Sequence, residues 1–133
     1  MADQKTVRFI ITRQDSPDSP SYTEEFDVPY RPNMNVISGL MYIRSNPVNA
    51  KGEKTTPVTW DMNCLEEVCG ACSMVINGRP QQSCSALVDK LEQPIRLAPM
   101  STFPIVRDLQ IDRSRMFDSL KKVKAWIPID GTY

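Results

Sequence analysis

The chain has 133 residues, which is enough for one domain built around a single hydrophobic core. Its 16 basic and 16 acidic side chains cancel, so no global charge favours nucleic acid or an anionic membrane surface as a partner. No run of 18 apolar residues could span a bilayer, and the first residues, Met1 to Lys5, are polar and unlike a secretory signal. Together these features predict a soluble, intracellular, globular protein.

The first part of the chain predicts two strands and a helix. Residues 7–12 and 22–28 are rich in β-branched and aromatic side chains and flank a turn over 15–20, which indicates an antiparallel hairpin. Asn35 is placed to cap a helix over 36–44. The buried face of this helix is expected to comprise Val36, Ile37, Leu40, Met41 and Ile43. Two strands followed by a helix packed across them are the opening of a β-grasp fold.

The middle of the chain predicts an exposed excursion and then a second hairpin. Residues 45–63 form the excursion, with a short strand expected at 57–60, where Trp60 is expected to pack beside the cysteines and keep water away. The dipeptide Asn77-Gly78 follows an apolar run and is typical of a type I′ turn, because both central residues of that turn need positive φ. The return strand is expected to bring Cys84 back to the base of the loop that carries the other cysteines.

The last part of the chain predicts short strands and a terminal helix. Residues 95–97 are expected to form a strand, and residues 103–109 a strand and a turn. Asp112 is placed to cap a helix over 113–126. One face of this helix carries Met116, Phe117, Leu120 and Val123. The chain then runs in an extended segment to Tyr133, which suggests a boundary imposed from outside.

All the cysteines of the chain lie in one stretch, Cys64-x4-Cys69-x2-Cys72-x11-Cys84. This is the plant-type [2Fe–2S] spacing, in which C-x4-C-x2-C precedes a distant fourth cysteine. Two disulfides, a structural zinc site or four unconnected thiols are the alternatives. The chain has no histidine, which removes the Rieske cluster and every zinc site that uses imidazole. The spacing favours a tetrathiolate iron–sulfur site.

The residues around the cysteines predict how such a site is tuned. The backbone amides of residues 65–71 are candidate donors to sulfur, and so are the hydroxyls of three serines, which are Ser73, Ser83 and Ser85. Such donors would raise the reduction potential of a cluster. The carboxylates of Asp61, Glu66 and Glu67 would lower it, because negative charge near a cluster disfavours its reduction. No residue is expected to be catalytic in its own right, and no proton chemistry is expected at this site.

Three stretches together resemble one known family. These are the cysteine segment 64–78, the element Val106-Arg107-Asp108-Leu109-Gln110-Ile111-Asp112, and the end of the terminal helix at Lys124-Ala125-Trp126-Ile127. They resemble the N-terminal half of the iron–sulfur subunit of succinate dehydrogenase (complex II) and fumarate reductase, closest to the Bacillus-type enzymes. The resemblance covers essentially the whole chain.

The resemblance implies an α+β fold, a β-grasp domain of the plant-type 2Fe–2S ferredoxin-like kind, over residues 1–111. Residues 112–133 then form a helix and an extended segment that lead toward a helical second domain absent from this chain. The implied ligands of a [2Fe–2S] cluster are Cys64, Cys69, Cys72 and Cys84. The C-x2-C-x2-C-x3-C-P runs that hold the [4Fe–4S] and [3Fe–4S] clusters of the family are missing, so the chain resembles a fragment. Many family members also have glycine where Glu67 stands; a left-handed backbone there costs glutamate more than glycine.

The function implied by the resemblance is electron transfer within succinate dehydrogenase or fumarate reductase. Single electrons would pass from the FAD of a flavoprotein subunit through the [2Fe–2S] cluster toward quinone, with no substrate site on this chain. The implied partners are that flavoprotein and, only through the missing domain, a membrane-anchor cytochrome b subunit. The implied location is cytoplasmic, peripheral on the inner face of the cell membrane. A free-standing plant-type ferredoxin and a zinc-binding β-grasp docking module are the alternatives.

Overall fold

The computed structural model describes residues 5–129, so residues 1–4 and the end of the expected terminal segment, 130–133, lie outside it. β1 (Thr6–Arg13) and β2 (Tyr22–Pro29) form the predicted antiparallel hairpin, with Thr6 opposite Pro29 and Arg13 opposite Tyr22. Buried and more exposed residues alternate along β1, as expected for a strand with one face on the core.

A five-stranded mixed sheet in the order β2-β1-β5-β3-β4 forms the centre of the domain. The three further strands of this sheet are β3 (Ser73–Ile76), β4 (Arg79–Gln82) and β5 (Ile95–Ala98). β5 lies between β1, to which it is parallel, and β3, to which it is antiparallel. The β3–β4 hairpin turns at Asn77 (φ 49°) and Gly78 (φ 81°), which confirms the predicted turn with positive φ at both central residues.

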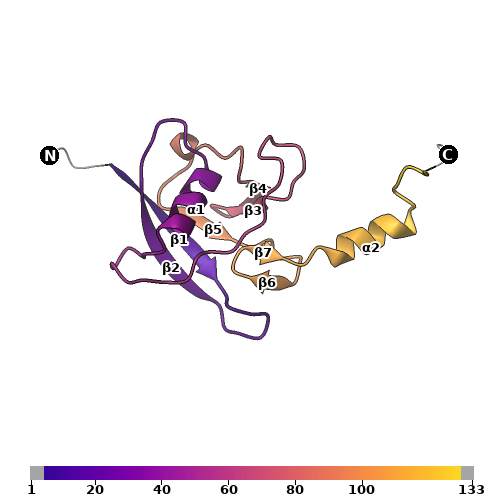
Figure 1. Cartoon of the computed structure of the whole chain (residues 1–133), viewed down its shortest axis with the longest axis horizontal. Coiled ribbons are helices and arrows are strands. Elements are labelled where there is room, and N and C mark those ends of the chain that lie inside the picture. Colours follow the sequence, from indigo (N-terminus) through magenta and orange to yellow (C-terminus); the bar gives the residue numbers. More distant parts are fainter. Residues whose placement is uncertain (1–4, 130–133) are drawn as a thin grey trace.

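Helix α1 (Val36–Ser45) packs across this sheet (Figure 1), and the α+β fold expected from the sequence is confirmed. Asn35 caps the helix as predicted, because its Oδ1 accepts the Ser38 N–H at 2.9 Å. Gly39 faces the ring of Phe9 so closely that an added Cβ would lie 2.5 Å from Phe9 Cζ. The prediction was wrong for Met41, whose side chain is 46% exposed, because it lies beside the face that Val36, Ile37, Leu40 and Ile43 bury.

The expected strand at 57–60 does not form, although Val58 is buried. The backbone of Thr59 instead binds two residues of the C-terminal part. Its N–H donates to the Asp108 carboxylate at 3.1 Å, and its C=O accepts the Leu109 N–H at 3.0 Å. The Asp108 side chain thus accepts the N–H of Thr59 that would otherwise donate to a neighbouring strand. The neighbouring excursion is held by an isolated bridge between Val48 and Lys54.

A buried ion pair links this segment to the sheet. The guanidinium of Arg13, which is fully buried at the end of β1, contacts the Asp108 carboxylate through Nε–Oδ1 (3.2 Å) and Nη2–Oδ2 (3.0 Å). Arg13 Nη1 also donates to Glu24 at 2.7 Å. Because Asp108 binds Thr59 as well, the chain that enters the cysteine loop is tied to both first strands.

The C-terminal part contains a small second sheet and a projecting helix. β6 (Ile105–Arg107) and β7 (Gln110–Ile111) pair around a turn, as expected for 103–109. Earlier in the chain, between β4 and β5, η1 (Val88–Lys90) forms a single 3-10 turn. α2 (Ser114–Lys122) is shorter than the predicted 113–126, since Lys124 has φ 53° and leaves the helical region. Arg113 stands at its N-cap, and Asp112 Oδ1 accepts the Ser114 N–H at 2.9 Å.

Helix α2 extends away from the sheet (Figure 1), and none of its residues is buried. Its apolar face is therefore open, and Phe117 is 54% exposed. Among the helices of residues 5–129, none is long and apolar enough to cross a membrane.

Candidate metal centre

The fold brings together the regions that carry the four cysteines. Cys64 and Cys69 lie in the loop before β3, Cys72 immediately precedes β3, and Cys84 follows β4. Cys69 is exposed, whereas Cys72 and Cys84 are buried. All four are free thiols, so the structure does not support the disulfide alternative.

The loop between Cys64 and Cys72 is shaped so that amides point at sulfur. Cys64 Sγ accepts the N–H groups of Glu66 and Cys69, both at 3.3 Å. Cys69 Sγ accepts the Ala71 N–H at 3.4 Å and the Cys64 N–H at 3.5 Å. The amides predicted as donors are therefore confirmed for three residues of the 65–71 segment.

Residues with a left-handed backbone bend the loop so that its amides point at sulfur. Leu65 (φ 58°), Glu67 (φ 62°) and Gly70 (φ 74°) alternate with residues of ordinary φ along the loop. Only glycine adopts such a φ without steric cost, so Leu65 and Glu67 carry local strain. The left-handed backbone expected at Glu67 is present.

The β3–β4 hairpin positions the other two thiols. Ser83 binds the Cys72 carbonyl twice, through its N–H at 3.3 Å and its hydroxyl at 2.8 Å, which joins the end of β4 to the start of β3. The Ser85 hydroxyl donates to the Gln82 carbonyl at 3.4 Å. Of the serine hydroxyls predicted as donors to sulfur, that of Ser85 donates to a carbonyl oxygen. The Ser83 hydroxyl binds the Cys72 carbonyl and also lowers the pKa of the Cys72 thiol through a hydrogen bond.

The hydrogen bonds change the acidity of the thiols. N–H donors at Glu66, Cys69 and Val68 lower the pKa of the Cys64 thiol to about 7. Burial raises the pKa of Cys72, but hydrogen bonds from Cys84 and Ser83 outweigh it and leave this pKa lowered. Burial and the neighbouring Cys72 thiol raise the pKa of Cys84. Since the thiolate is the form that binds metal, the loop favours the ligand form of Cys64 most strongly.

Charged side chains surround the loop unevenly. Glu66 and Glu67 are exposed, while Asp61 accepts a hydrogen bond from Gln110 Nε2 at 3.2 Å. Arg113 donates to the carbonyl oxygens of Gly70 and Ala71, the two residues between Cys69 and Cys72. No signal in the sequence points to Arg113, because it lies 42 residues from the nearer of these partners.

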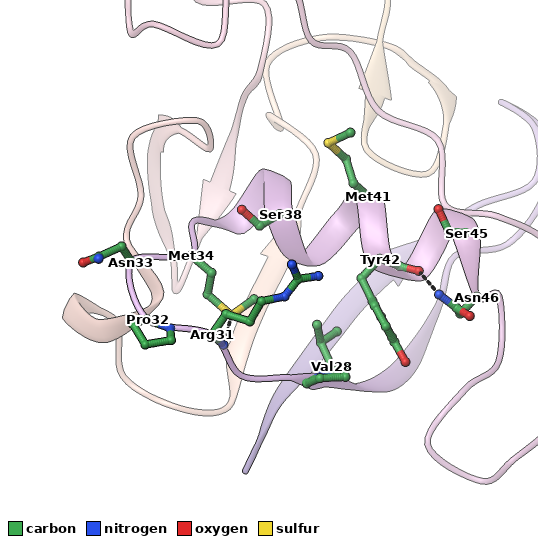
Figure 2. A pocket seen from close by; sticks show the side chains of 11 residues that line it. Val28, Arg31, Pro32, Asn33, Met34, Ser38, Met41, Tyr42, Ser45 and Asn46 are labelled. Carbon is green, nitrogen blue, oxygen red and sulfur yellow. Dashed lines mark hydrogen bonds between the residues drawn. The ribbon is translucent and has the colours of Figure 1, made fainter. Parts of the chain in front are cut away.

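Trp60 and a surface groove both lie next to helix α1. Trp60 is half-buried against the core, with the Arg44 guanidinium 6.0 Å from its ring centroid. A groove of about 720 Å³ lies between the end of β2 and α1, and Met41 and Tyr42 line it (Figure 2). No cysteine lines this groove, so it is separate from the cysteine site.

Residues 8–118 match the family described as "2Fe-2S iron-sulfur cluster binding domain". The chain belongs to this family. Its [2Fe–2S] cofactor and the resemblance seen in the sequence are thereby confirmed. The chain is 82% identical over its full length to the succinate dehydrogenase iron-sulfur subunit of Bacillus subtilis (strain 168), of which it covers 53%.

Two further proteins show a more distant likeness. The fumarate reductase iron-sulfur subunit of Mycobacterium tuberculosis is 31% identical over 96% of this chain and 49% of its own length. The chain thus spans about half the length of these curated relatives. A chain in the solved structure "Mycobacterium smegmatis Sdh1 complex in the apo form" superposes with a TM-score of 0.73 over 98% of this chain and 52% of its own length. At 21% identity this likeness concerns the fold alone.

The arrangement of the thiols fits the cofactor of this 2Fe-2S family. Hydrogen bonds link Cys64 with Cys69 and Cys72 with Cys84, and the charge of Cys64 also acts on Cys84, so the thiols form two pairs that lie near each other. Within residues 5–129, no group of three or more Cys, Asp or Glu side chains converges on the position of a single ion. Two pairs suit a cluster of two irons, each of which takes two protein ligands, better than one tetrahedral zinc ion.

Proposed function

We propose that this chain is the [2Fe–2S] part of the iron–sulfur subunit of a succinate dehydrogenase or fumarate reductase complex. In this role it passes single electrons from the FAD of a flavoprotein subunit toward quinone. Family membership and the 82% identity to the Bacillus subtilis subunit support the proposal. The observation that carries it is the cysteine loop, whose N–H groups point at the sulfurs of Cys64 and Cys69.

The residues that would hold the cluster are Cys64, Cys69, Cys72 and Cys84. The bound cluster supplies reversible one-electron chemistry. The chain itself holds the thiolates and donates N–H groups to them, which disperses negative charge and favours reduction. The β3–β4 hairpin buries Cys72 and Cys84 and keeps water from that side of the site.

Metal and sulfide analysis tests this proposal directly. After anaerobic purification or reconstitution, we expect iron and acid-labile sulfide in equal amounts and a visible spectrum that dithionite bleaches. Cys84→Ser should remove most of the colour, whereas Ser85→Ala, next to it and exposed, should retain it. A colourless wild-type protein with stoichiometric zinc and no labile sulfide would overturn the proposal in favour of a zinc-binding module.

The proposed partners are an FAD-containing flavoprotein and, through sequence beyond this chain, a membrane-anchor cytochrome b subunit. This assembly would place the protein peripherally on the inner face of the cell membrane. Support comes from the relatives, which are named as subunits of succinate dehydrogenase and fumarate reductase. Succinate should bleach the cluster only after the flavoprotein is added; a cluster that stays oxidised in that mixture would favour a free-standing ferredoxin.

We propose further that the β-grasp domain comprises residues 1–111 and that residues 112–133 lead toward a second domain. The open apolar face of α2 and the doubled length of the relatives support this boundary. In a Trp60→Phe background Trp126, which is 57% exposed, is the only tryptophan. We expect acrylamide to quench it less in a full-length subunit than in this chain. Equal quenching in the two would contradict the boundary.

A further inference from the structure

The side chain of Arg113 binds the cysteine loop from the base of helix α2. Its Nη1 donates to Gly70 O at 3.2 Å, and its Nη2 donates to Ala71 O at 2.7 Å. These are the only two residues between Cys69 and Cys72. The guanidinium thus holds both internal carbonyl groups of the Cys69–Cys72 turn at once, which its planar fork of donors suits well.

Holding a carbonyl also orients the amide of the same peptide unit. In a trans peptide the C=O and the N–H point in opposite directions across one plane. Gly70 O and Ala71 N belong to one such unit: the oxygen faces Arg113, and the N–H donates to Cys69 Sγ at 3.4 Å. Ala71 O belongs to the next peptide unit and also faces Arg113. Together with the Ser73 N–H, which binds Gly70 O at 3.1 Å, Arg113 therefore helps to aim the Ala71 N–H at Cys69 Sγ without touching a sulfur.

The guanidinium also brings a permanent positive charge close to the ligands. Arginine stays protonated in proteins, and here its charge lies one residue away from Cys69 and Cys72. Accepting an electron makes a thiolate-bound cluster more negative, so a fixed positive charge at this distance stabilises the reduced state. Both effects of Arg113, the oriented amide and the charge, act in the same direction.

Arg113 further connects the loop to helix α2. Its own carbonyl accepts the N–H groups of Met116 at 2.9 Å and Phe117 at 3.3 Å, which begin the helix. The same residue therefore starts the helix through its backbone and grips the ligand turn through its side chain. A displacement of the first turn of α2 would move the guanidinium relative to Gly70 and Ala71.

We propose that Arg113 is a positioning residue that orients the Cys69–Cys72 turn and raises the reduction potential of the [2Fe–2S] cluster. This inference rests on the proposed ligands Cys69 and Cys72. It does not depend on the identity of the electron donor, because it concerns only the chain's own residues and the bound cluster.

Three variants separate charge from geometry. Arg113→Gln removes the charge, Arg113→Lys keeps the charge but loses the two-pronged grip, and Arg115→Gln is the matched control. Arg115 lies in the same helical turn, but its Nη1 donates to Thr102 O at 2.9 Å and not to the cysteine loop. The first readout is the midpoint potential from a dithionite titration followed by electron paramagnetic resonance. The second is amide hydrogen exchange at Ala71 in cluster-free protein.

We expect Arg113→Gln to reduce the equilibrium constant for cluster reduction about tenfold, which is 59 mV for a one-electron couple. Arg113→Lys keeps the charge and should lower the potential by less than Arg113→Gln does, while amide exchange at Ala71 becomes faster than in the wild type. Arg115→Gln should match the wild type in both readouts. Loss of the cluster in Arg113→Gln alone would also support the inference.

A potential for Arg113→Gln equal to that of Arg115→Gln, in protein that holds its cluster, would overturn the inference. If the wild type binds no cluster, the proposed function fails. The exchange measurement then still decides the role of Arg113: unchanged exchange at Ala71 in Arg113→Gln overturns the positioning role, and faster exchange supports it.

Discussion

The ion pair between Arg13 and Asp108 predicts a large loss of stability on Asp108→Asn. Both side chains are fully buried, and the Asp108 carboxylate accepts four hydrogen bonds, two of them from Arg13 and the others from the N–H groups of Gln14 and Thr59. Asparagine preserves the volume and tolerates the left-handed backbone of this position, where φ is 48°. The substitution therefore removes the charge and one acceptor oxygen without adding backbone strain.

The expected magnitude follows from the burial. Removing one partner of a buried pair costs about 3–5 kcal/mol. Glu24, whose Oε1 lies 2.7 Å from Arg13 Nη1, still compensates part of the Arg13 charge and places the loss at the lower end of this range. At this chain length each kcal/mol lowers the midpoint of thermal unfolding by roughly 3–5 °C, so we expect a decrease of about 10 °C or more. Circular dichroism during thermal and urea unfolding measures both quantities.

Glu25→Gln provides the matched control for Asp108→Asn. It removes the contact between Glu25 and Arg8, which are 50% and 43% exposed and whose charged atoms lie 2.9 Å apart. Exposed pairs contribute little, so the control should lie within about 1 kcal/mol of the wild type. If Asp108→Asn costs no more than this control, the buried pair does not hold the cysteine-loop segment to the sheet.

Three other substitutions test individual contacts. Gly39→Ala places a Cβ 2.5 Å from Phe9 Cζ and should lower the free energy of unfolding by about 1–3 kcal/mol in urea; unchanged stability would contradict the packing. Glu67→Gly relieves a left-handed residue and should unfold at a higher temperature than Glu67→Gln, which retains it; equal midpoints would refute the strain. Burial raises the pKa of Glu24, but hydrogen bonds, that from Arg13 foremost, outweigh it and leave the pKa lowered from 4.5. The stabilisation by Glu24 is complete above its unfolded-state pKa and is lost as the pH falls through the lower folded value. As the pH falls, the free energy of unfolding should therefore decrease more steeply in the wild type than in Glu24→Gln. Equal slopes in the two proteins would contradict this role of Glu24.

Local signals in the sequence were sufficient where the interaction itself is local. Asn35 precedes the helix that it caps by one residue, and Asn77-Gly78 contains the whole turn that reverses β3 into β4. The cysteine spacing predicts a shared site in the same way, because three of the four thiols lie in one loop. Each of these features is decided by residues within a few positions of one another.

Long-range pairing could not be predicted in this way. Arg13 and Asp108 are 95 residues apart, and an arginine at the end of a strand usually lies in solvent. The strand expected at 57–60 failed for the same reason, since the distant Asp108 carboxylate takes the Thr59 N–H. Periodicity likewise placed an apolar face on the terminal helix, but it cannot say what covers that face, and in this chain α2 is open.

The cysteine loop shows why residue types predict ligands better than they predict loop shape. Spacing selects the thiols, but the loop aims its amides at them only by placing Leu65 and Glu67 in a left-handed conformation. Each costs roughly 1–2 kcal/mol, so contacts elsewhere must hold the loop in place. In the described structure these contacts come from distant elements, Arg113 at α2 and Ser83 after β4. The geometry of the ligand loop is therefore a property of the assembled domain, and a peptide spanning residues 64–72 alone should not retain it.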